Sequence, residues 1–308
     1  MINTSITQNQ IMRGGNSEIL LKAISGPPLT SKEAYSLIPM FGDGLGDLCD
    51  TAAKVRDNRK QTFLTFSPKV FIPLTRLCRD TCSYCTFRKE PDNTADVFMS
   101  PDEVLEVALK GQNLGCTEAL FTLGERPEKR YPEAQIWLNR NGYRSTLQYL
   151  VDMCKLVNEK TDLLPHANPG TMSKREMAEL KPHNPSMGLM LENISPQLFA
   201  KGGPHEFAPS KRPSVRIKTI TIAGILRIPF TTGLLIGIGE TLKERIESLL
   251  YLRSLHRQFG HIQEVIIQNF RAKPQTQMES HPDASTNDLL WTIAAARLIM
   301  GSTVNIQV

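Results

Sequence analysis

The sequence predicts an α/β fold, specifically a partial (β/α) barrel of the TIM type in which helices cover a parallel sheet. From residue 68 onward, short apolar runs alternate with longer helical patterns, as in a parallel sheet with helical crossovers. The runs are continuously apolar, which is typical of strands buried on both faces. Three crowded cysteines follow the first run directly, and a parallel barrel carries its chemistry at the carboxyl ends of its strands.

Seven strands and six helices follow from this alternation. Ser100 with Glu103, and Ser173 with Glu176, have the spacing of a capping box and mark two helix starts. The expected strands are residues 69–75, 118–124, 163–170, 186–193, 230–239, 264–270 and 303–308. The expected helices are residues 100–115, 145–160, 173–181, 214–224, 241–260 and 286–301.

The segment before the barrel has a different character. Residues 1–30 are polar and are expected to be frayed, and two short helices are expected over residues 30–38 and 45–57. The glycine cluster in "FGDGLGD" has no strand before it, so it predicts a turn rather than a phosphate site. We therefore divide the chain into an N-terminal leader with short helices, residues 1–64, and a barrel core, residues 65–308.

Composition limits the kinds of partner. The formal charge of +5 is mild and the basic residues are scattered, which favours a small anionic ligand over nucleic acid. The first 30 residues show no signal peptide, and the most apolar stretch, residues 217–238, is too interrupted to span a membrane. Six cysteines with three in eight residues do not resemble a secreted disulfide framework. A reducing cytoplasm is the expected compartment.

The cysteine motif is the main candidate for chemistry. Cys78, Cys82 and Cys85 have the spacing C-x3-C-x2-C, and the next possible ligands, Cys116 and His166, are far along the chain. A structural zinc ion needs four ligands, so zinc is an alternative without support from the spacing. A [4Fe–4S] cluster held by three cysteines leaves one iron open to a further ligand.

This motif, with the aromatic Tyr84 before the third cysteine and a place after the first barrel strand, resembles the radical S-adenosylmethionine (SAM) superfamily. The resemblance implies a barrel of the radical SAM type and a [4Fe–4S] cluster on Cys78, Cys82 and Cys85. In this superfamily the open iron binds the amino and carboxylate groups of SAM, and an electron from the cluster cleaves it to methionine and a 5′-deoxyadenosyl radical. Tyr84 would lie near the adenine.

Further residues match superfamily positions that contact SAM. The chain has Leu-Gly-Glu at residues 123–125 where the superfamily usually has Gly-Gly-Glu, a departure at the first position. "GLLIGIGE" fits the superfamily pattern G-x-I-x-G-x-x-E with leucine in the isoleucine place. The SAM-binding residues that the resemblance implies are Tyr84, Gly124, Glu125, Glu192, Arg216, Gly237 and Glu240. A turn, a structural acid or a solvated arginine is the alternative at these positions. The remaining cysteines, Cys49, Cys116 and Cys154, are expected in the core.

Several long strings identify the chain more narrowly. "SPKVFIPLTRLCRDTCSYCTF", "LLPHANPGTMS", "HEFAPSKRP" and "GHIQEVIIQNFRAKPQTQM" are similar to the 7,8-didemethyl-8-hydroxy-5-deazariboflavin (FO) synthase family, in its CofG-type subunit. The resemblance implies oxidation and ring closure of an adduct of tyrosine-derived 4-hydroxybenzyl and 5-amino-6-ribitylaminouracil, with release of ammonia. It also implies a CofH-type partner that supplies this adduct, and a low-potential electron donor such as ferredoxin or flavodoxin.

The base for this reaction is left open. Ring closure with loss of ammonia needs polar groups in a dry barrel. His166, Asn168, His205 and Lys273 are the candidates, and Glu206, Gln268 and Asn269 are further polar residues near expected strand ends. His205 and Glu206 lie in a loop that is expected to cover the site.

Two more expectations concern the chain as a whole. Members of this family continue past the position that matches Val308, so the barrel is expected to lack its C-terminal end, and an inactive truncated form is one possible outcome. The cysteine motif is also compatible with radical SAM enzymes of the CofH, futalosine or biotin-synthase type. An electron-transfer module or a tRNA-modifying enzyme is disfavoured, because the strand–helix alternation is long and no basic stripe is present.

Overall fold

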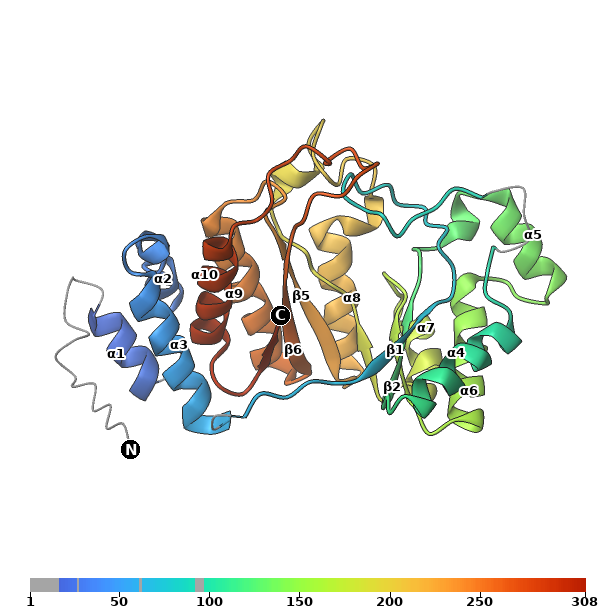
Figure 1. The fold of residues 1–308 in the computed structure, drawn as a ribbon, viewed down its shortest axis with the longest axis horizontal. Coiled ribbons are helices and arrows are strands. Elements are labelled where there is room, and N and C mark those ends of the chain that lie inside the picture. The colour runs from blue at the N-terminus through green and yellow to red at the C-terminus, as the bar shows by residue number, and fades with distance from the viewer. Residues whose placement is uncertain (1–16, 27, 61–62, 92–96) are drawn as a thin grey trace.

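A computed structural model describes residues 17–26, 28–60, 63–91 and 97–308. Its centre is a parallel sheet of seven strands in the order β1 to β7, as the sequence predicts (Figure 1). The strands are β1 (Lys69–Pro73), β2 (Glu118–Thr122), β3 (Leu164–Asn168), β4 (Ser186–Gly188), β5 (Phe230–Ile236), β6 (Ile262–Asn269) and β7 (Asn305–Gln307).

Each strand pairs with the next one along the chain, as in a barrel built from successive β/α units. The strand predicted over residues 186–193 is shorter than expected, because its regular pairing ends at Gly188. The chain then leaves the ladder and meets β5 again through an isolated bridge between Glu192 and Leu234. This irregularity brings Glu192 to the carboxyl end of the sheet.

All six predicted barrel helices are present. The capping boxes at Ser100–Glu103 and Ser173–Glu176 form as predicted. The six are α4 (Pro101–Asn113), α6 (Thr146–Lys160), α7 (Lys174–Leu180), α8 (Pro213–Ile225), α9 (Leu242–Phe259) and α10 (Thr286–Met300), and α3 (Leu45–Lys60) precedes them.

Three short helices complete the described chain: α1 (Ser17–Ser25), α2 (Ser31–Tyr35) and α5 (Pro132–Arg140). The prediction of frayed chain over residues 1–30 is wrong for α1, whose Leu20 is buried in the core; residues 1–16 lie outside the described residues. The sequence did not predict α5. Its N-cap, Tyr131, offers no side-chain cap to the helix, so the local start signal is missing.

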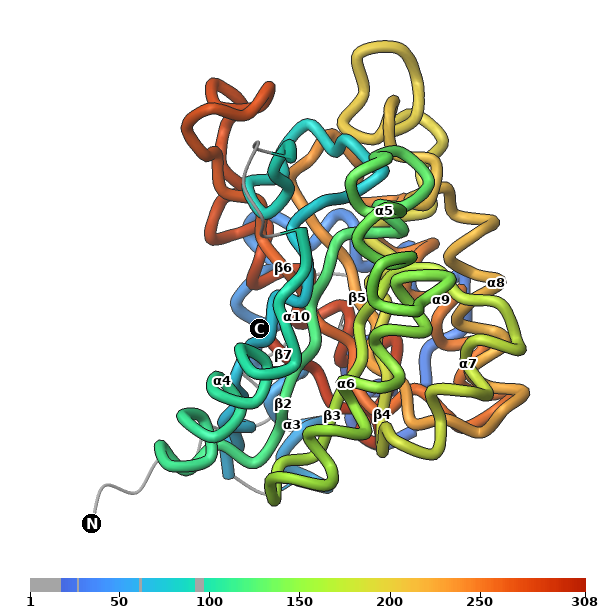
Figure 2. The backbone as a smooth tube through the Cα atoms, turned by 90° about the vertical axis from the view of Figure 1, so that its right-hand side faces the viewer, coloured from blue at the N-terminus to red at the C-terminus, as the bar shows by residue number. Residues whose placement is uncertain are grey.

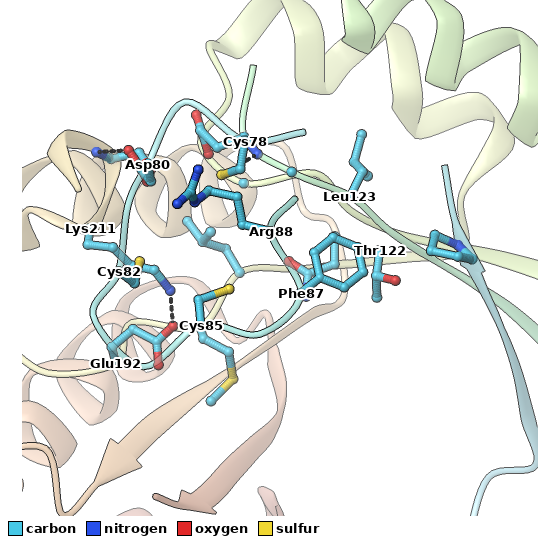
Figure 3. A pocket seen from close by; sticks show the side chains of 18 of the residues that line it. Cys78, Asp80, Cys82, Cys85, Phe87, Arg88, Thr122, Leu123, Glu192 and Lys211 are labelled. Atoms are coloured by element: carbon cyan, nitrogen blue, oxygen red, sulfur yellow. Dashed lines mark hydrogen bonds and ion pairs between the residues drawn. The ribbon is translucent and has the colours of Figure 1, made fainter. Parts of the chain in front are cut away.

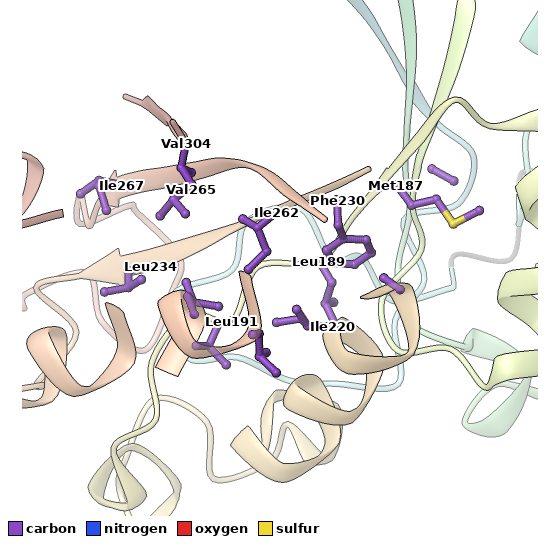
Figure 4. Close-up of a cluster of buried hydrophobic side chains, with 14 of the residues drawn as sticks. Met187, Leu189, Leu191, Ile220, Phe230, Leu234, Ile262, Val265, Ile267 and Val304 are labelled. Atoms are coloured by element: carbon purple, nitrogen blue, oxygen red, sulfur yellow. The ribbon is translucent and has the colours of Figure 1, made fainter. Parts of the chain in front are cut away.

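The main core lies between the sheet and the covering helices. Phe230 and Leu234 of β5 point away from the barrel interior and pack beside Ile220 of α8 and Leu191, as Figure 4 shows. These side chains are almost fully buried. The strands are continuously apolar because the covering helices bury their outer side chains and the barrel interior encloses their inner ones.

The barrel is not closed. Among the described residues, β1 and β7 form the two edges of the sheet and do not pair with each other. Phe71, on the inner face of β1, is 60% exposed for this reason. The interior can thus be reached between the two edges.

The N-terminal segment packs against the barrel. α3 lies beside α10 in Figure 1, and the Trp291 indole of α10 donates a hydrogen bond of 3.0 Å to the Leu37 carbonyl. The Arg253 guanidinium on α9 also donates to the Leu29 carbonyl. In the described part of the chain, no helix combines the length and apolar character needed to cross a membrane.

Candidate functional site

A cavity of about 490 Å³ opens at the carboxyl ends of strands β1 to β4. The loops that follow the strands gather at this end of the molecule, including the cysteine loop in cyan and residues 195–212 in yellow (Figure 2). The sequence-predicted residues that line the cavity are Cys78, Cys82, Tyr84, Cys85, Gly124, Glu125, Asn168, Glu192 and Arg216. Figure 3 shows the three cysteines on its walls, with Glu192 and Lys211 to one side.

The cysteine loop is fixed from two directions, by a main-chain bridge on one side and by an arginine side chain on the other. Its Thr81 forms an antiparallel bridge with Phe207, so the loop before α8 pairs with it. On the other side, the Arg130 guanidinium donates to the Arg79 carbonyl at 3.2 Å and to the Thr81 hydroxyl at 2.6 Å. The positions of the cysteines are therefore set by the fold around them and not by the loop alone.

Burial dominates the chemistry of the cysteines. It raises the pKa of Cys78 to about 11 and that of Cys82 to about 12, so both are thiols at neutral pH without a metal. The Glu125 main-chain N–H donates to the Cys78 sulfur at 3.1 Å, a contact that favours the thiolate when metal binds.

The donor set fits a cluster better than a single ion. Within the described residues, no three His, Cys, Asp or Glu side chains converge closely enough to hold one metal ion, as a tetrahedral zinc site requires. A cubane cluster instead takes each thiolate on a separate iron, so its ligands are spread around a cavity. Cys78, Cys82 and Cys85 line one cavity in this way. They are the residues that would hold the cluster.

Gly124 allows the second strand to approach the cysteine loop. A Cβ at this position would lie 1.8 Å from the Leu77 carbonyl oxygen, so only glycine fits. The neighbouring carboxylate of Glu125 is buried and accepts hydrogen bonds from the Thr171 N–H at 2.8 Å and hydroxyl at 2.6 Å. The departure to Leu123 leaves this arrangement intact.

Glu192 has the features of a ligand-binding carboxylate. Its φ is +66°, a left-handed conformation that costs energy for a residue with a side chain. Its Oε2 is buried and has no hydrogen-bond partner among the described residues, although the side chain lines the cavity. Burial opposes its charge, yet Lys211 and Arg216 hold the pKa of Glu192 below its ordinary value. Glu192 is therefore an ionised acceptor at the cavity with one oxygen that has no partner among the described residues.

Two cations stand beside this carboxylate. Arg216 is buried rather than solvated, donates from Nε to the Ser210 carbonyl at 3.2 Å, and lies 3.9 Å from Glu192. Lys211 forms a closer ion pair with Glu192 and also lines the cavity. Lys211 was not predicted as a site residue, because only the folded loop brings it to Glu192.

Tyr84 is held from behind by His205. The phenol oxygen and the His205 Nε2 are 2.9 Å apart, and the rings meet edge to face with centroids 5.6 Å apart. Burial lowers the pKa of His205 to about 3, so the imidazole is neutral. His205 does not line the cavity, and it acts on the site through Tyr84.

The remaining residues predicted to bind SAM lie outside the cavity. Glu240 accepts hydrogen bonds from the N–H groups of Gly237 and Ile238, and it pairs with Arg245 at 2.7 Å. Gly237 packs so closely on Ala284 that a Cβ would come within 2.6 Å.

Of the polar residues predicted as candidates for the base, some line the cavity and others do not. Asn168 lines the cavity. His166 precedes it by two residues on β3, is buried, and has its Nδ1 2.7 Å from the Ser186 hydroxyl. Gln268 and Asn269 end β6 and Lys273 follows it, and none of the three lines the cavity. Glu206 is exposed, and its carboxylate accepts from the Gly202 N–H at 2.7 Å.

Known proteins share both the sequence and the fold. A sequence profile described as the Radical SAM superfamily matches residues 72–252. The chain is 54% identical over 237 residues to a 7,8-didemethyl-8-hydroxy-5-deazariboflavin synthase of Methanopyrus kandleri, covering 77% of this chain and 71% of that protein. It is 52% identical over 298 residues to an FO synthase of Nocardia farcinica, covering 94% of this chain and 34% of that protein. The chain thus spans about a third of the length of this FO synthase.

Solved structures agree on the architecture. Methylornithine synthase (PylB) superposes with a TM-score of 0.72 at 20% identity, over 94% of this chain and 78% of that one. The hydrogenase maturase HydG gives 0.76 at 16% identity, over 97% of this chain and 64% of that one. These similarities concern the fold. Together with the matched profile and the relative that is 54% identical, they show that the chain belongs to the radical SAM superfamily, in the family of the deazaflavin (FO) synthases.

Proposed function

We propose that this protein is a radical SAM enzyme of FO formation and that it carries out the CofG-type half of the synthesis. The substrate is 5-amino-5-(4-hydroxybenzyl)-6-(D-ribitylimino)-5,6-dihydrouracil, and the products are FO, ammonium, methionine and 5′-deoxyadenosine. In this balance SAM is the two-electron oxidant, and ammonia leaves as the middle ring closes. The single observation that carries the proposal is the cavity that Cys78, Cys82 and Cys85 share with Glu192 and Arg216.

Each lining group has a task that its surroundings support. The three cysteines hold the cluster, which, with SAM bound, supplies a 5′-deoxyadenosyl radical for hydrogen abstraction. Glu192 offers its spare oxygen to hydroxyl groups, and Arg216 offers a fixed, buried guanidinium to a carboxylate. Tyr84, braced by His205, presents a flat apolar surface to the adenine.

The partners follow from the same proposal. A CofH-type protein supplies the adduct, and a low-potential donor such as ferredoxin or flavodoxin reduces the cluster. Thiolate ligands and a reduced cluster require a reducing compartment, for which the cytoplasm is our proposal. The family membership and the names of the relatives support a role in FO synthesis, on which these proposed partners depend.

The test is anaerobic incubation of the reconstituted protein with SAM, dithionite and the adduct. We expect deazaflavin fluorescence, with 5′-deoxyadenosine and ammonium formed in equal amounts. In a parallel incubation with tyrosine and 5-amino-6-ribitylaminouracil in place of the adduct, consumption of both without deazaflavin would assign the CofH-type half instead. SAM cleavage that no added deazaflavin precursor accelerates would refute the proposed reaction.

A further inference from the structure

The inner face of the sheet carries two neighbouring polar side chains at the wall of the cavity. Thr122 of β2 pairs in register with Pro73 of β1 and with Asn168 of β3. Residues that pair across neighbouring parallel strands point to the same face of the sheet, and the strands lie about 4.8 Å apart. All three residues line the cavity. We call the two polar members, Thr122 and Asn168, the polar row.

The side chains of the polar row are available to a ligand. Both are half-buried and line the cavity, and neither forms a hydrogen bond to another described residue. The residues just before them, Phe121 and Ala167, point the opposite way and are fully buried in the core. The row thus offers a hydroxyl and a carboxamide, which together carry hydrogen-bond donors and acceptors but no charge.

An apolar surface adjoins the polar row. Phe71 precedes Pro73 by two residues on β1, so it lies on the same face of the sheet as the row. Its side chain lines the cavity and is 60% exposed, although phenylalanine is usually buried in a folded protein. An aromatic ring of a ligand can therefore pack on Phe71 while a neighbouring polar edge meets the row.

The polar row is separate from the charged groups of the cavity and close to the cysteines. Figure 3 shows Thr122 on the far side of the three cysteines from Glu192 and Lys211. Thr122 precedes Glu125 by three residues, and the Glu125 N–H donates to the Cys78 sulfur at 3.1 Å. Three residues of extended chain span at most about 10 Å. A neutral ligand held at the row therefore lies beside the cysteines, while the ionised groups remain for a charged one.

We propose that the polar row binds the uracil edge of the substrate and that Asn168 determines the specificity for it. This assignment rests on the proposed function. The imide edge of the uracil presents an N–H between two carbonyl groups. The Asn168 carboxamide can accept from that N–H and donate to one carbonyl, and Thr122 can donate to the ligand beside it. Phe71 supports the hydroxyphenyl ring. Because a carboxamide does not titrate near neutral pH, Asn168 selects the substrate and is not the base.

Binding of the adduct tests this inference. The protein carrying its cluster is titrated with the adduct by calorimetry, with SAM present and no reductant, for wild type, Asn168→Leu and Thr122→Val. We expect the adduct Kd to rise roughly tenfold or more in Asn168→Leu and about threefold in Thr122→Val, as when neutral hydrogen bonds are lost. The control Asn113→Leu, at an exposed position at the end of α4, should bind like wild type. Adduct binding by Asn168→Leu within twofold of wild type would overturn the inference.

An N-methylated adduct shows which group Asn168 recognises. Methylation of the imide nitrogen removes the N–H and leaves the charge of the ligand unchanged. Wild type should bind the methylated compound about tenfold more weakly than the adduct, whereas Asn168→Leu should bind the two within twofold of each other. A variant that keeps the full wild-type preference would overturn the assignment of the uracil edge.

Cluster content and SAM affinity separate this role from a structural one. Iron content, and SAM affinity measured by equilibrium dialysis, should match wild type in both row variants. Weaker SAM binding with unchanged adduct binding would overturn the inference, because the row would then belong to the SAM site. If Asn168→Leu does not retain its cluster, Asn168→Ala answers the same question with the same thresholds.

The inference and the proposed function fail in different ways. A wild-type protein that binds the adduct in the expected pattern but makes no deazaflavin would refute the proposed function alone. A wild-type protein that makes deazaflavin, while Asn168→Leu binds the adduct as tightly as wild type does, would refute the inference alone.

Discussion

Glu192 and Glu240 follow neighbouring strands, and each is a buried carboxylate beside an arginine. The Glu240 side chain is fully enclosed, and its oxygens accept from two main-chain N–H groups and from Arg245, which is itself bound to Asp288 at 2.8 Å. Glu192 is similarly buried and lines the cavity, yet its Oε2 has no hydrogen-bond partner among the described residues.

The difference is the basis of our proposal that the Glu192 side chain, rather than that of Glu240, binds a ligand. Glu240 has internal partners for both oxygens, and these contacts stabilise the turn after β5. An unused buried acceptor is costly unless something else binds it. Glu192 lines the cavity and has a buried oxygen without a hydrogen-bond partner among the described residues, whereas Glu240 lies outside the cavity and has partners for its oxygens. The following predictions test this division.

The largest effect is expected at the cysteines. Cys82→Ala removes a proposed cluster ligand from the cavity wall, so SAM cleavage should be abolished, and the same holds for Cys78→Ala and Cys85→Ala. Cys154 is buried beside the Asn184 side chain, away from the cavity. Cys154→Ala should keep iron content and cleavage, at a cost in stability of roughly 1–2 kcal/mol for the lost packing.

Iron and sulfide analysis with visible absorbance after anaerobic reconstitution measures this contrast. Stoichiometric zinc, with no iron–sulfur absorbance, would reject the cluster assignment. Full SAM cleavage by Cys82→Ala would remove that residue from the ligand set.

The next effect concerns the structural carboxylate. Glu240→Ala leaves Arg245 with Asp288 alone and frees two main-chain N–H groups in the turn, so unfolding should become easier by about 3–5 kcal/mol. Denaturant unfolding monitored by circular dichroism measures the change. If Glu240→Ala keeps wild-type stability and instead weakens SAM binding, then the two carboxylates have the same role and the comparison fails.

His166 extends the comparison to acid stability. It is buried against Ser186, with Lys69 lowering and Glu118 raising its pKa, and burial, the largest effect, brings that pKa to about 4 from an ordinary 6.5. Between these values the unfolded chain binds the extra proton, so stability falls as the pH drops from about 6.5 to 4. His166→Gln should remove on the order of 2–3 kcal/mol of this loss.

Urea unfolding at pH 7 and pH 4.5 measures the slope. A residual slope is expected from His261, whose pKa is also lowered by burial to about 4. Equal slopes for wild type and His166→Gln would mean that His166 is solvated or charged in the folded protein.

The features that could be predicted from the sequence are those that depend on residues close together in the chain. The strands and their helices were predictable because apolar continuity and capping boxes act within a few residues, and the cysteine motif because its ligands share one loop. Lys211 was missed because the fold, and not the spacing, brings it to Glu192. Glu192 and Glu240 both match superfamily positions in the sequence. The sequence does not tell which of the two carboxylates has its hydrogen-bond partners within the protein, because those partners are brought together by the fold.

The smallest expected effect is also the sharpest test of the comparison. Glu192→Gln keeps the shape and one acceptor oxygen but removes the charge that Lys211 and Arg216 balance. Because Glu192 faces the cavity, solvent or ligand can compensate the neighbouring cations, and stability should change by less than for Glu240→Ala. SAM affinity should fall about tenfold, as expected for a lost charge-assisted hydrogen bond. Equilibrium dialysis of SAM with the protein carrying its cluster measures the affinity, with the helix-surface variant Glu106→Gln as control. Unchanged SAM affinity in Glu192→Gln, with unfolding made as easy as in Glu240→Ala, would show that both carboxylates serve the fold.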